Sequence, residues 1–177
     1  MISFLKYLLP FIVLWLVSFP AKTDIMHASE SGFIIENTRI SPRDPQVTWQ
    51  ALVADVDNWW PKDHSYWLEQ GTFSIDAVAG GCFCETSSDG RSAEHMHISF
   101  VDPGKLLRMT GGLGPLQGMG MYGALDFVFA ETATGTEVTM TYRVNGINPD
   151  GFEQLAPIVD AVQGIQIGGL KAFLESP

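Results

Sequence analysis

The side chains that could do chemistry gather in one short stretch, on either side of an Asp89-Gly90 pair. They are thiols, carboxylates and imidazoles, namely Cys82, Cys84, Glu85, Glu94, His95 and His97. Carboxylates can act as general acids or bases, and thiolates with imidazoles are zinc ligands. Which chemistry is possible depends on the face of the structure on which each side chain lies.

An Asp-Gly pair between two β-rich runs predicts a hairpin with a two-residue turn. This register places Cys84 opposite His95, and Cys82 opposite His97. Alternation along the strands then puts these four side chains on one face and both glutamates on the other. A slip of one residue would break both pairings, so the prediction depends on the register.

The face of Glu85 and Glu94 is predicted to point inward. It also carries apolar side chains, namely Phe83, Met96, Ile98 and Phe100. Two opposed carboxylates in an apolar site cannot both ionise cheaply, so one has a raised pKa or a cation such as Arg108 compensates. Glu85 and Glu94 are therefore candidate acid/base or ligand-orienting residues. The alternative is that both lie at a wet end of the hairpin.

The side chains predicted on the opposite face are of the types that bind zinc, but their arrangement disfavours a zinc site. Four ligands on a flat sheet face do not converge tetrahedrally without a bulge. A disulfide between Cys82 and Cys84 is also disfavoured, because residues i and i+2 of a strand lie about 6.6 Å apart with parallel side chains. The sequence therefore predicts packed thiols beside surface histidines, with no metal and no cofactor.

Composition narrows the class of protein. The 177 residues carry a formal net charge of −10, with 46% apolar and 17% charged residues. This composition fits one globular domain rather than a disordered chain. The acidity argues against nucleic acid as a partner, which needs a basic face for phosphates, and against adhesion to anionic membranes.

The N-terminal segment is predicted to lie outside the folded domain. Residues 7–21 (YLLPFIVLWLVSFPA) carry no charge, follow Lys6 and contain two prolines. A spanning helix needs about 20 apolar residues, so the pattern favours a secretory signal peptide over an anchor. We predict a signal peptide and linker over 1–28, cleaved after Ala21 or Ala28, and a periplasmic or secreted protein. If this N-terminal segment is not cleaved, the protein would contact a membrane through it alone.

The rest of the chain predicts an α+β domain over residues 32–175. After a polar linker at 22–31, a β-rich run at 32–40 precedes a helix over about 45–57, capped by Asp44 before Pro45. Short strands with tight turns fill the middle, and 150–174 has the periodicity of a long helix. We expect a curved antiparallel sheet of about seven strands wrapped on this C-terminal helix.

Four stretches carry a resemblance to a known superfamily: VTWQALVADVDNWW, Gly80-Gly81-Cys82-Phe83, VDPGKLLRM and GTEVTMTYRV. Their arrangement resembles the helix-grip fold of the START-like, SRPBCC superfamily, which includes polyketide cyclases and chaperone-ATPase activator-like domains. The resemblance implies a deep apolar cavity between sheet and helix, but no single activity. The secretion signal departs from the cytosolic activator-like members and disfavours a chaperone partner.

The cavity that the resemblance implies is predicted to bind a small apolar molecule. Its expected lining is Trp67, Phe83, Met96, Met109, Phe127, Tyr142, Val159 and Gln163. Glu85 and Glu94 would orient the polar end of the ligand. One alternative is a cyclase, dehydratase or hydrolase that uses either glutamate as acid/base, and another is a protein-interaction domain. No nucleophile–base pair is evident in the sequence, which favours binding over catalysis.

Two loops are candidates for the cavity walls. The aromatic segment 59–71 is expected to cap one end, although its tryptophans are also typical of core anchors. Residues 111–123 are rich in glycine and methionine, which supply mobility and adaptable apolar contact. This loop is predicted to be a lid, with an ordinary hairpin loop as the alternative.

Overall fold

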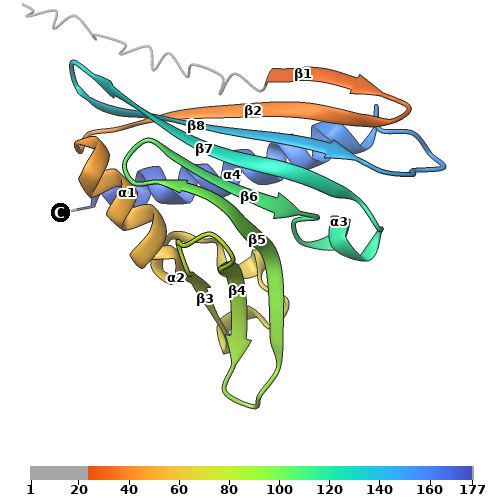
Figure 1. The fold of residues 1–177 in the computed structure, drawn as a ribbon, viewed down its shortest axis with the longest axis horizontal. Helices are drawn as coiled ribbons and strands as arrows, with labels where there is room; N and C mark the ends of the chain where they lie inside the picture. The colour runs from red at the N-terminus through yellow and green to blue at the C-terminus, as the bar shows by residue number, and fades with distance from the viewer. Residues whose placement is uncertain (1–23, 177) are drawn as a thin grey trace, which may run out of the picture.

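A computed structural model describes residues 24–176 of the protein. Eight strands form one antiparallel sheet in the order β1-β2-β8-β7-β6-β5-β4-β3. The long C-terminal helix α4 crosses one face of this sheet, as Figure 1 shows. The predicted α+β class, an antiparallel sheet with a long C-terminal helix, is therefore confirmed.

The element bounds follow the turn signals of the sequence closely. The strands are β1 Asp24–Ser29, β2 Gly32–Ser41, β3 Gly71–Ile75, β4 Cys82–Ser87, β5 Ser92–Asp102, β6 Leu106–Gly111, β7 Tyr122–Thr132 and β8 Gly135–Asn145. The α-helices are α1 Pro45–Ala54, α2 Val56–Trp59, α3 Pro115–Gly118 and α4 Leu155–Glu175. Two 3₁₀ turns, Lys62–His64 and Leu68–Gln70, lie between α2 and β3.

The first helix begins where the sequence predicts. The Asp44 side chain accepts hydrogen bonds from the backbone N–H groups of Gln46 and Val47, and Pro45 occupies the first turn. The predicted helix over about 45–57 ends earlier than expected, at Ala54, and a short α2 continues the chain to Trp59. The Trp59 indole N–H donates to the carbonyls of Ala51 and Leu52, which ties α2 back onto α1.

The polar segment before β2 is a strand and not the predicted linker. Residues 24–29 pair antiparallel with β2 through a tight turn that joins Ser29 to Gly32. The prediction was wrong because it relied on polar composition. An edge strand forms its backbone hydrogen bonds with a single neighbouring strand, so it can be polar and exposed. The predicted signal sequence over 7–21 lies outside the described residues.

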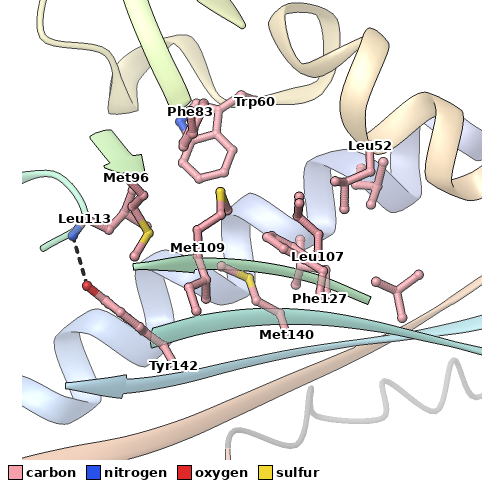
Figure 2. Packing of buried hydrophobic residues seen from close by; sticks show 14 of the residues in the cluster. Leu52, Trp60, Phe83, Met96, Leu107, Met109, Leu113, Phe127, Met140 and Tyr142 are labelled. Carbon is pink, nitrogen blue, oxygen red and sulfur yellow. Dashed lines mark hydrogen bonds between the residues drawn. The ribbon is translucent and has the colours of Figure 1, made fainter. Parts of the chain in front are cut away.

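The core fills the space between the inner face of the sheet and the helices. Figure 2 shows Phe83, Met96 and Met109 converging with Trp60 in this layer. α4 packs mainly on β2, with further contacts to α1 and α2. Gly169 permits the approach of α2, because a Cβ at that position would collide with the Trp59 carbonyl. Among residues 24–176, no helix is both long enough and apolar enough to span a membrane.

Candidate functional site

A cavity of about 380 Å³ opens between α4, the segment after α2 and the loop that contains α3. Its apolar walls include Leu113, Leu116, Leu155, Val159 and Val162, and its polar walls include Ser65, Tyr66, His95, Tyr142, Gln163 and Gln166. Tyr66, Met119 and Ile158 are partly exposed and form its mouth. Trp60, His95 and Tyr142 are buried and form its deep end.

A buried carboxylate–imidazole pair lies at the deep end. Glu85 is fully buried, and its Oε2 lies 3.0 Å from Nε2 of His95, which is 3% exposed. Ser65 Oγ donates to Glu85 Oε1 at 2.5 Å, and the Tyr66 backbone N–H donates to Oε2 at 3.2 Å. The Glu85 carboxylate thus has three partners, and the His95 ring stands between it and the cavity.

These hydrogen bonds determine where the protons lie. Burial acts to raise the pKa of Glu85, but the donors from Ser65, Tyr66 and His95 outweigh it and hold that pKa below its ordinary value. A carboxylate only accepts hydrogen bonds, so the shared proton belongs to His95 Nε2. Burial lowers the pKa of His95 against the opposing effect of Glu85, so the ring is neutral near pH 7. Nδ1 therefore keeps its lone pair, and no hydrogen bond to it is found within residues 24–176.

Aromatic rings fix the orientation of His95. The Tyr66 ring stacks on the imidazole at 5.2 Å with an interplanar angle of 4°, and the Phe83 ring lies 5.0 Å away. The Tyr66 hydroxyl donates to the Gly114 carbonyl at 3.0 Å, which joins this cluster to the loop at the cavity mouth. Burial, and to a lesser degree the charge of Glu85, raises the pKa of the Tyr66 phenol.

A β-bulge explains why His95 lies inside. The predicted register holds for Cys82 opposite His97 and for Phe83 opposite Met96. Beyond Phe83 it shifts, so that Cys84 pairs with Glu94 and His95 becomes the extra residue of β5. An extra residue re-aims the side chains around it, and His95 and Met96 both point inward as a result.

The same shift corrects the prediction for Glu94. Glu85 faces inward as expected, but Glu94 is exposed on the outer face, where its carbonyl accepts a hydrogen bond from Gln117. Arg108, expected as a compensating cation, lies away from Glu85 and pairs with Asp126 at 2.7 Å. Phe100, also predicted to be inside, is 47% exposed because β5 has a second register shift between Ile98 and Phe100.

The prediction of free thiols is also wrong. Cys82 and Cys84 form a disulfide with their Cα atoms 5.4 Å apart. An undistorted strand separates such residues by about 6.6 Å, and the shorter distance occurs where the β4–β5 ladder changes register. The bridge occupies both thiolates, so neither can serve as a metal ligand.

Several polar atoms of the cavity have no hydrogen-bond partner within the described residues. They are Trp60 Nε1, both polar atoms of the Gln163 amide, and Gln166 Oε1. Gln163 and Gln166 lie one turn apart on α4 and are 1% and 4% exposed. An unsatisfied buried polar group costs about 1–3 kcal/mol, so such groups call for a ligand or water partner.

Tyr142, by contrast, has its hydrogen bonds complete. Its hydroxyl donates to the Gly111 carbonyl at 2.9 Å and accepts from the Leu113 N–H at 2.9 Å, the contact drawn in Figure 2. Burial raises the pKa of Tyr142 to about 12. The Tyr142 side chain is therefore neutral. It lines the cavity, and its hydrogen bonds fix the start of the glycine–methionine loop.

The predicted lining residues divide into three groups. Tyr142, Val159 and Gln163 line the cavity. Phe83, Met96, Met109 and Phe127 are fully buried in the core beside it and do not line it. Trp67 is also absent from the lining, and its ring lies 5.3 Å from the guanidinium of Arg91 instead.

Sequence reasoning missed His95 and Gln166 as lining residues, whereas Trp60 and Ser65 belong to the aromatic segment 59–71 that was expected to cap one end of the cavity. Gln166 carried a usable signal, since it lies one helical turn from Gln163 on the same face of α4. No such signal existed for His95, because amino-acid composition does not reveal a β-bulge. The glycine–methionine loop lines the mouth with Leu113, Leu116 and Met119, while its predicted action as a lid stays a prediction.

A second hollow of similar volume lies along β1, β2, β7 and β8 and is lined by Tyr122 and Arg143 among others. It contains none of the buried unpartnered polar atoms found within the described residues. The cavity beside α4 is therefore the stronger candidate site.

Solved structures show what fold this is. No protein-family model matches the chain, and no curated protein matches its sequence. Protein EF2215 of Enterococcus faecalis, a conserved protein of unknown function, matches at 18% identity and TM-score 0.62, over 88% of this chain and 78% of that one. Protein MLL2253 of Mesorhizobium loti matches at 20% identity and TM-score 0.55, over 80% and 96%.

A third match is protein CV1439 of Chromobacterium violaceum, at 16% identity and TM-score 0.55, over 81% of this chain and 98% of that one. Identities this low establish the fold alone. The class is an antiparallel sheet with a C-terminal helix, which is consistent with a helix-grip fold.

Proposed function

We propose that the protein binds a small molecule with an apolar body and at least one polar group in the cavity beside α4. The observation that supports this best is the set of unpartnered polar atoms on Trp60, Gln163 and Gln166, all of which line that cavity. Apolar walls with a few directed polar groups are typical of small-ligand sites. The volume of about 380 Å³ suits a ligand of a few fused rings or a short acyl chain.

The donors and acceptors define the polar part of the ligand. Trp60 Nε1 and Gln163 Nε2 can donate, whereas Gln163 Oε1 and Gln166 Oε1 can accept. A ligand carbonyl oxygen can accept from either donor, and a ligand hydroxyl or N–H group can donate to either acceptor. No charge on the ligand is required, and the acidic protein disfavours an anion.

Binding can be tested with N-phenyl-1-naphthylamine, a neutral apolar dye with one N–H donor. We expect its fluorescence to rise on binding to the wild-type protein and to be lost in Val162→Trp, because Val162 lines the cavity. Ile165→Trp is the matched control, since Ile165 lies on the same helix but is 57% exposed and outside the lining. Equal dye binding by both variants, or none by the wild type, would contradict the proposal.

Membership of the START-like superfamily and export from the cell are further parts of this proposal. The disulfide between Cys82 and Cys84 supports export, because such bonds persist in oxidising compartments. Cleavage after Ala21 would leave β1 whole, whereas cleavage after Ala28 would remove most of it. Intact-mass measurement of the exported protein should therefore give a chain that begins at Lys22. A mature chain that begins at Ser29, or one that retains residues 7–21, would contradict this part.

A further inference from the structure

We propose that the cavity is also a proton-transfer site, in which His95 Nδ1 removes a proton from a carbon atom next to a carbonyl group of the bound molecule. This inference rests on the proposed function, because the substrate must enter the same cavity. The substrate class is an enolisable ketone, aldehyde or ester with an apolar body.

The base is defined by geometry. Glu85 Oε2 lies 3.0 Å from His95 Nε2 and occupies that nitrogen, and His95 itself lines the cavity. Nδ1 is then the ring nitrogen left to accept a proton. Tyr66 stacks on the ring at 5.2 Å and keeps it from rotating. Glu85 is a positioning residue here, since it acts on the substrate only through His95.

Two residues of the cavity lining carry hydrogen-bond donors for an oxygen atom. The Trp60 ring lies 4.8 Å from Phe83, and the Phe83 ring lies 5.0 Å from His95, so indole and imidazole flank one ring. Trp60 Nε1 and Gln163 Nε2 are buried donors with no partner within the described residues. Donors placed where negative charge develops are a main source of catalytic stabilisation.

The proton-transfer step balances without any further reactant. The C–H bond next to the carbonyl breaks and its electron pair forms a C=C bond. The π-electron pair of the C=O bond then moves onto the oxygen. The proton goes to Nδ1, and the imidazolium so formed is stabilised by the Glu85 carboxylate. In a conjugated substrate the imidazolium then delivers the proton to the far end of the chain, which isomerises the substrate. Alternatively, the imidazolium N–H exchanges with solvent and a solvent-derived proton returns to the same carbon, which gives hydrogen exchange. The net reaction is an isomerisation or an exchange of hydrogen.

Hydrolysis fits the site less well. Ser65 is the hydroxyl closest to the pair, but its proton is donated to Glu85 Oε1. Its oxygen also accepts a hydrogen bond from the Trp67 backbone N–H at 2.9 Å. Ser65 is therefore engaged in holding the carboxylate and is not free to act as a nucleophile.

Hydrogen–deuterium exchange tests the inference directly. The probe is 2-tetralone in D₂O, with loss of the proton signals next to its carbonyl followed by NMR. We expect the wild-type protein to exchange these protons about 100-fold faster than His95→Gln, the usual contribution of a placed base. His97→Gln is the matched control, because His97 lies on the same strand and is exposed. It should keep the wild-type rate.

The role of Glu85 is tested by the pH profile of this exchange. The groups that face the His95 ring are Glu85 and the Tyr66 phenol, and Asp63 and His64 lie elsewhere on the cavity wall. The Glu85 charge raises the pKa of His95, so Glu85→Gln should move the rising limb of the profile to lower pH and reduce the plateau. An unchanged profile would show that Glu85 does not act through His95.

Dye binding separates the two proposals. If the wild type binds N-phenyl-1-naphthylamine but exchanges 2-tetralone no faster than His95→Gln, the proton-transfer site is refuted and the binding function stands. If the wild type binds no dye, the binding function itself fails. Should His95→Gln not fold, Val162→Trp leaves the Glu85–His95 pair in place and must still lose the exchange. Exchange that survives in Val162→Trp would place the chemistry outside the cavity.

Discussion

Two buried carboxylates, Glu85 on β4 and Asp126 on β7, lie in contrasting surroundings. Asp126 accepts from Arg108 Nε at 2.7 Å and from an Arg143 guanidinium N–H at 3.3 Å, and both arginines are about half exposed. Glu85 is fully buried, and within residues 24–176 the one ionisable side chain that hydrogen-bonds to it is His95, which is also buried. Arginine stays protonated at any physiological pH, whereas histidine can gain or lose a proton.

This contrast separates a structural ion cluster from a candidate proton carrier. The Asp126 cluster fixes charge at the surface of the sheet, beside solvent and away from the cavity. The Glu85–His95 pair stands at the end of a cavity and can change its charge.

Removal of one partner should have the largest effect. His95→Leu leaves the Glu85 carboxylate buried without its imidazole, and we expect the free energy of unfolding to fall by about 3 kcal/mol. Arg143→Leu leaves Asp126 paired with Arg108 and in reach of water. The free energy of unfolding of this variant should therefore fall by less than about 1 kcal/mol. Urea denaturation measures both. Equal losses would show that the two carboxylates are held alike.

Gly71 gives a second way to disturb only the inner carboxylate. A Cβ at this position would collide with Glu85 Oε1 and crowd Ser65 Oγ. We expect Gly71→Ala to cost about 2 kcal/mol, because the displaced carboxylate loses buried hydrogen bonds. Gly118→Ala is the control, since a Cβ there meets nothing within 4 Å, and it should stay within about 0.5 kcal/mol of the wild type. A neutral Gly71→Ala would mean that the carboxylate is free to move.

The sequence predicted more of the fold than of the site. Turn pairs, the Asp44 cap and the periodicity of α4 are local signals, and the elements that they define are present. The hairpin at Asp89-Gly90 is also present, but the predicted two-residue turn is wrong, because Thr86 pairs with Ser92 and Ser87 bonds to Arg91. The predicted register holds only at Cys82 and Phe83, beyond the bulge. Local signals suffice for elements because propensity and alternation act over a few residues.

The site depends on two features that no local pattern reveals. The bulge at His95 inverts the faces of Glu94 and His95, so a predicted glutamate pair is in fact a glutamate–histidine pair. The hydrogen bonds of Ser65 and Tyr66 to Glu85 join residues far apart in the chain. Both features arise from tertiary packing, which overrides the simple alternation of a strand.

The disulfide offers a smaller effect on the outer side of the same strand. Because the bridge between Cys82 and Cys84 closes a ring of only three residues, the chain-entropy relation gives about 1.5 kcal/mol of stabilisation. Replacement of both cysteines by alanine should lower the free energy of unfolding by about that amount. The exchange of 2-tetralone should be unchanged, since the bridge does not line the cavity. Loss of that exchange would show that the bridge also holds the bulge in place.

The pH dependence of stability should give the smallest and most specific difference. The pKa of His95 is lowered from its ordinary value of 6.5 by burial, so the unfolded chain binds this proton more readily than the folded one. The stability contributed by a neutral His95 is therefore complete above pH 6.5 and is lost as the pH falls through the folded pKa. The pKa of Glu85 is lowered from 4.5, so its own contribution is lost only below that pH.

We therefore expect wild-type stability to begin falling just below pH 6.5, well above the range in which carboxylates titrate. His95→Gln should flatten the curve between pH 6.5 and 4.5, with the fall below pH 4.5 retained. Urea midpoints measured at half-unit steps of pH resolve the two ranges. His97→Gln removes one imidazole from the same strand, so the difference between the two variants isolates His95. If both variants show the same slope between pH 6.5 and 4.5, the buried imidazole is not neutral in the folded state, and the assignment of Nδ1 as a free base is wrong.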